Sequence, residues 1–342
     1  QALFTGDKLS CDGSAEWPLR VEVYAMAISL SRKLAAVAKN ETTYGTAPAF
    51  SQSADAILLY ENRNPLSGVD TNLIDIDPIR GSFTKVKSIV GRQLYRLSAV
   101  TYLQGPENLG AGTPWRFGPL LRACGLQQTI NGTSSIVYTP RSSGFESVAI
   151  KIYPDGVSHL MEGAYGTFTL EANAAEGMRC TFDMLGLYNA PTVPDAIPSQ
   201  TLETVKALPF ISAAATIAGI TVVLKRVRLT WGGVVSERSD ANAADGLAGL
   251  QITDRAPTVE MEVEVDTAIL AVRNFFADLT AATTHALSWT LGTASGNRNV
   301  FSFPQAQLTS VPYGDVSGIR TFPLTYKIQH ATDETEMTWT MN

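Results

Sequence analysis

Apolar and polar residues alternate along most of the chain, and one succession of alternating segments occurs twice. Alternation with a period of two is typical of β-strands that have one buried face. In residues 146–188, and again in residues 285–328, the pattern predicts four strands with turns at the same places. A Gly-apolar-Arg sequence, at 177–179 and at 318–320, precedes the last strand both times. Two blocks with one order of strands and turns indicate a duplicated β domain.

Longer alternating segments precede each block. In the first half we predict strands over residues 82–91 and 94–103, paired through a turn at Gly91. In the second half we predict strands over residues 219–231 and 258–265. Both halves therefore begin with long strands and end with a four-strand block.

One short helix is predicted between the long strands and the block in each half. Within residues 113–125, a proline opens and a glycine closes a helix. That helix would pack on a sheet through Leu120, Leu121 and Cys124. In the second half Asp266 or Thr267 caps a helix whose apolar residues recur at spacings of three and four: Ile269, Val272, Phe276 and Leu279.

A proline-rich segment separates the two strand-rich halves, as linkers do. We predict an N-terminal extension with an extended arm over residues 1–54, a first β domain over 55–190, a linker over 191–218 and a second β domain over 219–342. With 342 residues, the chain is long enough for each domain to bury its own core. The predicted class is mainly β, a β-sandwich or partial barrel with a flanking α-helix.

Composition adds little that is specific. The formal net charge is −6, and the chain holds three cysteines and three histidines. Cys11, Cys124 and Cys180 lie too far apart for a metal or redox motif, and no second histidine stands at ligand spacing, so we predict no metal and no cofactor. No segment is long and apolar enough to commit the chain to a membrane. The N-terminus lacks a signal-peptide pattern, and Met26 is a candidate natural start.

Acidic residues alternate with apolar ones in the strand 258–265. Glu260, Glu262 and Glu264 therefore share one face of the sheet. Two interpretations stay open: a solvated face paired with the basic residues of 225–228 in a neighbouring strand, or a row of negative charge that lines something. We predict no catalytic residue, because carboxylates at positions i and i+2 of one strand face are a poor frame for an acid and a base on opposite sides of a substrate.

Short patterns spread over residues 27–330 resemble the major tail tube proteins of long-tailed bacteriophages. In chain order they are a Lys-x-Glu-x-x-Tyr-Gly arm (Lys39, Glu41, Tyr44, Gly45), a Leu-Leu-x-x-Cys-Gly helix end (Leu120, Leu121, Cys124, Gly125) and a Tyr-x-Asp-Gly hairpin (Tyr153, Asp155, Gly156). The resemblance implies a structural virion protein whose rings stack into a tube through which the genome passes. A chain with two tandem tube domains would close such a ring as a homotrimer with pseudo-sixfold symmetry.

The resemblance also implies partners and sites. Duplex DNA carries roughly one negative charge per 1.7 Å, so an acidic lumen would let it slide, and Glu260, Glu262 and Glu264 are the lumen candidates. The arm of residues 27–54 and the loop of residues 239–249 hold few core-forming residues and are expected to order on contact with another subunit. The contact candidates are Lys39, Glu41, Tyr44, Ser239, Asp240 and Asp245. Implied partners are further copies of the chain, the tape measure, tail terminator and distal tail proteins, and DNA in transit. Assembly would take place in the bacterial host cytoplasm, and the product would lie in the virion tail.

Three alternatives stay open. The same fold family would accommodate a secretion-system tube subunit. A β-sandwich that binds a receptor or belongs to a baseplate should expose an aromatic-rich loop, whereas Trp231, Trp289 and Trp339 all lie in predicted strands. A hydrolase on a β scaffold should show perturbed carboxyl pKa values in a cleft.

Overall fold

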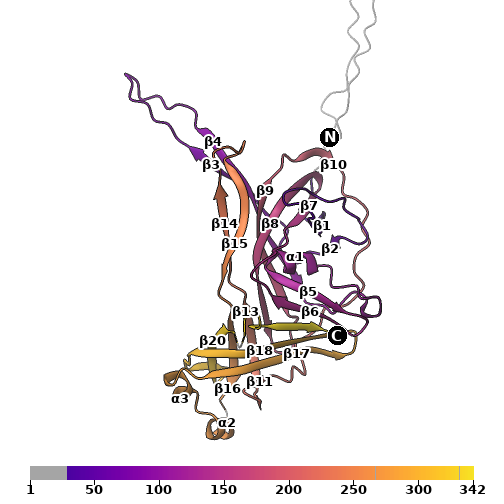
Figure 1. The fold of residues 1–342 in the computed structure, drawn as a ribbon, viewed down its shortest axis with the longest axis vertical. Helices are drawn as coiled ribbons and strands as arrows, with labels where there is room; N and C mark the ends of the chain where they lie inside the picture. The colour runs from indigo at the N-terminus through magenta and orange to yellow at the C-terminus, as the bar shows by residue number, and fades with distance from the viewer. Residues whose placement is uncertain (1–28, 266, 331) are drawn as a thin grey trace, which may run out of the picture.

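The computed structural model describes residues 29–265, 267–330 and 332–342 (Figure 1). Residues 1–28 of the predicted N-terminal extension and arm, and the predicted cap at Asp266, lie outside these residues. The described part is mainly β, with few and short helices, so the predicted fold class is confirmed.

The strands of the first half pair in the order β2–β1–β7–β8–β9–β4–β3, and all pairs are antiparallel. We call this set the first unit. Its strands are β1 (Leu34–Asn40), β2 (Ala56–Ile57), β3 (Leu66–Ile74), β4 (Ile89–Tyr102), β7 (Val148–Pro154), β8 (Gly156–Asn173) and β9 (Arg179–Tyr188).

The strands of the second half pair in the order β12–β11–β17–β18–β20–β16–β13, again antiparallel throughout. We call this set the second unit. Its strands are β11 (Thr216–Ile217), β12 (Ile220–Thr221), β13 (Leu224–Thr230), β16 (Thr258–Glu264), β17 (Thr284–Ala294), β18 (Asn297–Ser310) and β20 (Ile319–Gln329). The two orders correspond strand for strand, with β3 matching β13 and β8 matching β18.

The two units share one sheet. The last part of β8 pairs with β13, from Thr169 opposite Thr230 to Asn173 opposite Arg226. The result is the continuous order β3–β4–β9–β8–β13–β16–β20–β18, which we call the long sheet. The C-terminal β21 (Thr338–Met341) adds a second connection, because it pairs with β18 and with β6 (Ser135–Pro140) of the first half.

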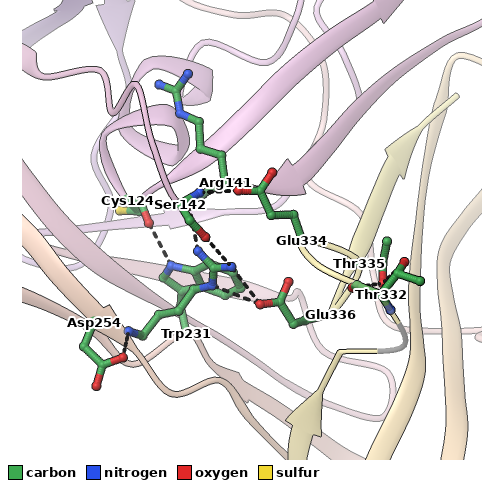
Figure 2. A network of polar contacts seen from close by, with 10 residues as sticks. Cys124, Arg141, Ser142, Trp231, Asp254, Thr332, Glu334, Thr335 and Glu336 are labelled. Atoms are coloured by element: carbon green, nitrogen blue, oxygen red, sulfur yellow. Dashed lines mark hydrogen bonds and ion pairs between the residues drawn. The ribbon is translucent and has the colours of Figure 1, made fainter.

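The core is also continuous. Phe168 of the first unit stacks on Trp231 at a ring-centroid distance of 5.6 Å, and Trp115 lies 6.3 Å from Trp339. Figure 2 shows the polar edge of this seam, where the Trp231 indole N–H donates to the Cys124 carbonyl at 2.7 Å. Arg255 bridges the Arg141 carbonyl and the Glu336 carboxylate, both at 2.7 Å. The expectation that each half buries its own core is therefore wrong, because aromatic side chains from both halves fill one interior.

The helices are shorter than the sequence predicted. Helix α1 (Gly118–Ala123) buries Leu120, Leu121 and the following Cys124, as expected. The second helix was predicted as one element but forms two, α2 (Thr267–Val272) and α3 (Phe275–Thr280). The break occurs because the Asn274 side chain accepts hydrogen bonds from the backbone N–H groups of Phe276 and Ala277, both at 3.1 Å, and so caps a new helix.

Two hairpins extend from the long sheet toward the same end of the molecule (Figure 1). One joins β3 to β4 through residues 75–88. The predicted turn at Gly91 is wrong, because β4 runs without interruption from Ile89 to Tyr102 and pairs with β3 and β9. The other hairpin joins β14 (Gly233–Ser239) to β15 (Leu247–Arg255), so the predicted 239–249 loop is mostly a hairpin turn.

The remaining elements surround these. Strand β5 (Leu126–Asn131) pairs with β6, β10 (Thr192–Asp195) pairs with β8, and β19 (Gly314–Val316) pairs with β20. A 3-10 turn covers Leu109–Ala111. Residues 34–40 of the predicted arm form β1, whose Ala35 to Ala38 are buried, so the extended-arm prediction is wrong for them. The predicted domain boundaries themselves stay a prediction.

Candidate assembly surfaces

Around β13 and β16, one face of the long sheet packs on the core and the other is polar. Nearer the β3–β4 hairpin the same outer side carries Tyr165, Leu185 and Leu187, and the β14–β15 hairpin packs on them. In β16, Val259, Met261 and Val263 are buried, whereas Glu260 is exposed. Glu262 and Glu264 are half-buried on the same side as Glu260. The predicted alternation of this strand is therefore confirmed, and its three glutamates lie on what we call the polar face.

Charges of both signs alternate across the polar face. Residues directly opposite each other in antiparallel strands share one face. Glu260 lies opposite Arg228, Arg228 opposite Glu171, and Glu171 opposite Arg179, in a row across four strands. Each of these charges therefore has a neighbour of opposite sign, and the face is not uniformly acidic.

Ion pairs strengthen this neutralisation. The Glu264 carboxylate lies 2.7 Å from the Lys225 ammonium group, and Arg226 pairs with Glu171. The Glu262 carboxylate accepts a hydrogen bond from the Thr321 hydroxyl at 2.8 Å. These contacts agree with the interpretation that the acids pair with a basic neighbouring strand. Of the three glutamates, Glu260 is the one exposed to solvent.

A row of threonines runs beside the charged row. Thr258, Thr230, Thr169 and Thr181 lie opposite one another on four successive strands. Threonine suits a strand because it is β-branched, and its hydroxyl is neutral. The polar face thus carries an uncharged hydrophilic row across the seam between the two units.

The fold and this polar face agree with the comparison of the chain with known families. Residues 31–328 match the phage tail tube protein family. The chain belongs to that family. A search of curated proteins found no match. The predicted resemblance is confirmed, and this tail tube protein is a structural component of the virion tail.

Three contact candidates of the arm of this tail tube protein make contacts within the chain. The Lys39 ammonium group lies 3.3 Å from the Asp55 carboxylate. Glu41 accepts hydrogen bonds from the backbone N–H groups of Gly45 and Gly163, at 2.9 and 2.8 Å. These bonds fix the polypeptide between residues 39 and 45 against β8.

Tyr44 connects this segment to the β14–β15 hairpin. Its hydroxyl accepts a hydrogen bond from the Leu250 backbone N–H at 2.6 Å, and burial raises the pKa of Tyr44 to about 12. Its ring fits against Gly249 and Gly163, where an added Cβ would lie 2.6 and 2.8 Å from ring or hydroxyl atoms. The two segments that the sequence singled out for contacts therefore meet each other.

The other three candidates lie at the end of the β14–β15 hairpin. Asp240 accepts from the Asn242 backbone N–H at 2.9 Å, and Asp245 accepts from the Leu247 backbone N–H at 3.2 Å. Ser239 lies opposite Leu247 in the hairpin. These aspartates shape the turn locally and remain at the surface.

A larger apolar surface was missed by the sequence analysis. The β3–β4 hairpin projects from the body of the tail tube protein (Figure 1), and we call residues 75–88 its tip. Exposed large apolar side chains occupy the tip and the strand ends beside it: Leu73, Ile74, Ile76, Ile79, Phe83, Val86, Ile89 and Val90. Exposed apolar clusters of this kind mark contact surfaces. The sequence carries a signal for this surface, because these apolar residues do not follow the alternation that places side chains on the buried face of a strand.

One buried carboxylate bears on the hydrolase alternative. Burial raises the pKa of Glu203, whose side chain accepts from the Arg116 backbone N–H at 2.9 Å. Across the described ranges, no three histidine, cysteine, aspartate or glutamate side chains gather where they could hold a metal ion. The described helices are all too short to cross a membrane.

Proposed function

We propose that this tail tube protein assembles with copies of itself into rings that stack into a tube, and that DNA leaves the virion through this tube. The observation that carries the proposal is the long sheet, built from two units with the same order of strand pairing. A sheet of this kind, with one polar face and one face on the core, supports the role of a wall around a water-filled channel. The repeated order also supports a tandem duplication of one tube domain.

Ring size follows from the repetition. If each unit takes one position around the ring, three chains supply six positions, and the homotrimer has pseudo-sixfold symmetry. The Thr169 to Asn173 segment of β8, paired with β13, joins two such positions within one chain. The trimer therefore needs the same kind of joint between chains.

The polar face is our candidate for the channel lining, with Glu260, Glu262 and Glu264 on it. Its basic residues alternate with acids, so a phosphate that approaches Arg228 also meets Glu260 and Glu171. Tight binding of DNA requires many basic groups without acidic neighbours. Such groups release the counterions of the DNA, which makes that binding salt-dependent. A lining of paired charges and threonine hydroxyls would let DNA slide, and we assign no catalytic step to the chain.

Contacts between rings would use the projecting surfaces. The β3–β4 tip offers apolar side chains, and the β14–β15 turn with Ser239, Asp240 and Asp245 offers polar ones. The tape measure, tail terminator and distal tail proteins are the partners expected at the lumen and the tube ends. We place assembly in the cytoplasm of the bacterial host.

The receptor-binding alternative has less support. Its expected aromatic-rich surface loop would use tryptophan, yet Trp115, Trp231, Trp289 and Trp339 are all buried. The exposed Phe83 lies in a hairpin tip with aliphatic neighbours, which fits a subunit contact better. A secretion-system tube subunit would assemble into rings through the same kinds of contact. The family match favours the phage tail.

Negative-stain electron microscopy and mass photometry of the purified protein over a concentration series test the proposal. We expect particles of three chains at intermediate concentration and stacked rings or tubes at high concentration. A chain that stays monomeric at all concentrations, even with preformed tail tips added as initiators, would contradict it.

A further inference from the structure

The long sheet ends in two different unpaired edges. At one end is β3, which pairs with β4 and, among the described residues, with no strand on its other side. At the other end, β18 pairs with β17 over residues 297–307, but its continuation β19 pairs only with β20 in the described part of the chain. An unpaired strand edge carries free N–H and C=O groups that can pair with another strand.

Inside the chain, the strands that correspond to these two edges already pair with each other, and we call this pairing the internal joint. In the two units β3 corresponds to β13, and β18 with β19 corresponds to β8. Strands β8 and β13 pair with each other over Thr169–Asn173 and Arg226–Thr230. We propose that the edge at residues 312–316 of one copy pairs with the edge at residues 63–67 of a second copy, in the same antiparallel way. This inference rests on the self-assembly proposed above and assigns the residues that close the ring.

The register of the proposed joint follows from the partner strands. Arg179 lies opposite Tyr102, the last residue of β4, and Thr321 lies opposite Glu264, the last residue of β16. Arg179 and Thr321 are therefore equivalent in the structure, one residue beyond the alignment of the two Gly-apolar-Arg sequences, and the buried residues Phe182 and Leu324 then also correspond. On the next strand Glu171 lies opposite Arg179, and Gly314 lies opposite Thr321. Glu171 and Gly314 are therefore equivalent as well.

The other edge is aligned in the same way. Arg228 lies opposite Glu260, four residues before the end of β16. Four residues before the end of β4 is Ser98, whose N–H donates to the Pro65 carbonyl at 2.8 Å. Pro65 is thus equivalent to Arg228. Because Glu171 and Arg228 lie opposite each other within the chain, Gly314 should lie opposite Pro65 of the next copy.

Burial shows that the internal joint is complete and the proposed joint is open. At the internal joint, Leu170 and Leu229 lie opposite each other and are each 1% exposed. Their equivalents are Tyr313, which is 67% exposed, and Leu66, which is half-buried. A second copy would cover Tyr313 as β13 covers Leu170.

The proline at the edge is compatible with pairing. In a β-strand, the N–H and C=O groups of one residue point to the same side, and successive residues point to opposite sides. The Pro65 carbonyl points to Ser98 of β4, so its missing N–H lies on that side as well. The free edge presents the backbone groups of Asn64 and Leu66 instead.

The joint is head-to-tail, because it uses two different edges of the chain. A head-to-tail contact repeats around an axis and closes a ring when the rotation permits. The antiparallel direction of β8 and β13 would be kept at every joint, so the sheet would run without a break around the channel. If a different tail protein or a chain of the next ring occupied these edges instead, the cross-links between residues 63 and 316 described below would not form.

Disulfide cross-linking tests the register. Arg63 and Val316 are the equivalents of Arg226 and Asn173, which lie directly opposite each other within the chain. In a Cys11→Ser background, the native Cys124 and Cys180 are buried and give little reaction. We expect oxidised assemblies of Arg63→Cys mixed with Val316→Cys to give covalent dimers, and the double variant to give covalent species up to three chains. Arg63→Cys mixed with Ile130→Cys, on the exposed β5, is the matched control and should give none.

A second variant keeps the inference testable if cysteines disturb assembly. We expect Tyr313→Ser to stay folded, with a slightly lower melting temperature because its ring lies 5.4 Å from the Phe322 ring, and to lose ring formation, whereas Ile130→Ser should keep both the melting temperature and ring formation. Tubes of the cysteine variants without any cross-link, or full assembly of Tyr313→Ser, would overturn the joint and leave the proposed tube intact. Absence of assembly by the unmodified chain would overturn both.

Discussion

The two hairpins of the long sheet occupy corresponding places in the two units, yet they end differently. The β3–β4 hairpin continues outward and leaves the apolar side chains of its tip in solvent. The β14–β15 hairpin lies against the first unit and buries Leu247, Leu250 and Ile252 next to Leu94 and Tyr165. One hairpin has thus found its partner within the chain, and the other requires a partner from outside.

The different path of the second hairpin has a local cause. Gly232, between β13 and β14, has φ +65°, a conformation that favours glycine. A Cβ at this residue would lie 2.5 Å from the Ala256 carbonyl oxygen, so the two strands approach closely here. In the first unit β4 continues through the corresponding region as one strand. This left-handed residue, Gly232, turns the chain so that the second hairpin lies against the first unit.

The largest effect is expected from the tip of the first hairpin. Ile79 and Phe83 are fully exposed in the single chain, and burial of each against another subunit is worth about 1.5–3 kcal/mol. We expect the double variant Ile79→Ser, Phe83→Ser to raise the protein concentration needed for tubes by about 100-fold or more. Electron microscopy over a dilution series measures this.

The melting temperature of that variant serves as its control and should match the unmodified chain. A second control is Val193→Ser, at an exposed residue remote from both hairpins, which should assemble normally. Tubes of the double variant at the unmodified concentration would show that the tip makes no subunit contact.

Truncation inside the second hairpin should act on the monomer instead. Leu250 is buried between the hairpin and the first unit, so Leu250→Ala should lower the free energy of unfolding by about 2–5 kcal/mol. Chemical denaturation of the monomer measures the change. Val234→Ala, at an exposed site of the same hairpin, is the matched control. Equal stability of both variants would mean that the hairpin is not packed as described.

The Tyr44 contact should give a smaller effect. Tyr44→Phe keeps the ring and removes the hydroxyl that accepts from the Leu250 N–H. An unsatisfied, partly buried N–H costs about 1–3 kcal/mol, and faster hydrogen exchange is expected in residues 247–252. Exchange measured by mass spectrometry tests this, with Tyr313→Phe as the control. Unchanged protection of residues 247–252 would exclude Tyr44 as the group that holds the hairpin.

The smallest expected effect concerns pH and distinguishes the two units. Val148 and His285 are equivalent, since each lies opposite an alanine of the next strand, Ala164 and Ala306, and both are buried. Burial lowers the pKa of His285 below its ordinary value of 6.5, although Asp278 at 3.1 Å acts in the opposite direction. Arg273 and Tyr326 are the other titratable groups that face it.

A histidine pKa that is lower in the folded state gives stability above pH 6.5, and this stability is lost as the pH falls through the folded-state pKa. We expect the melting temperature to fall between pH 7 and pH 5.5, and to fall less in His285→Val. His159, whose pKa burial also lowers, provides a comparison variant, His159→Val. An identical pH profile for the unmodified chain and His285→Val would exclude His285 as the source.

Periodic patterns in the sequence predicted the fold well. The alternation of Val259 to Glu264 and the buried face of α1 were readable, because each depends on local spacing. The order of the repeated blocks was readable too, but the second and third strands predicted in each block form one strand, β8 or β18. The shared core was not readable, because it depends on which distant strands pair, such as β8 with β13 and β21 with β6. The break in the second helix depended on a single capping side chain, Asn274.

The candidate surfaces were predictable only in part. The glutamates of β16 were found by period, but their basic partners could be tested only once the register of β13 was known. Tyr44 was singled out by resemblance, and its contact with Leu250 joins residues 206 positions apart. The tip of residues 75–88 was missed because part of it was assigned to a predicted strand over residues 82–91, paired through a turn at Gly91.

Cryo-electron microscopy of tubes assembled from the purified protein tests the central claim most directly. We predict three chains in each ring, six repeats of one strand-pairing order around the channel, and Glu260 and the row of four threonines facing the lumen. A tube wall with the polar face turned outward, or rings whose chains do not alternate the two units around the axis, would contradict it.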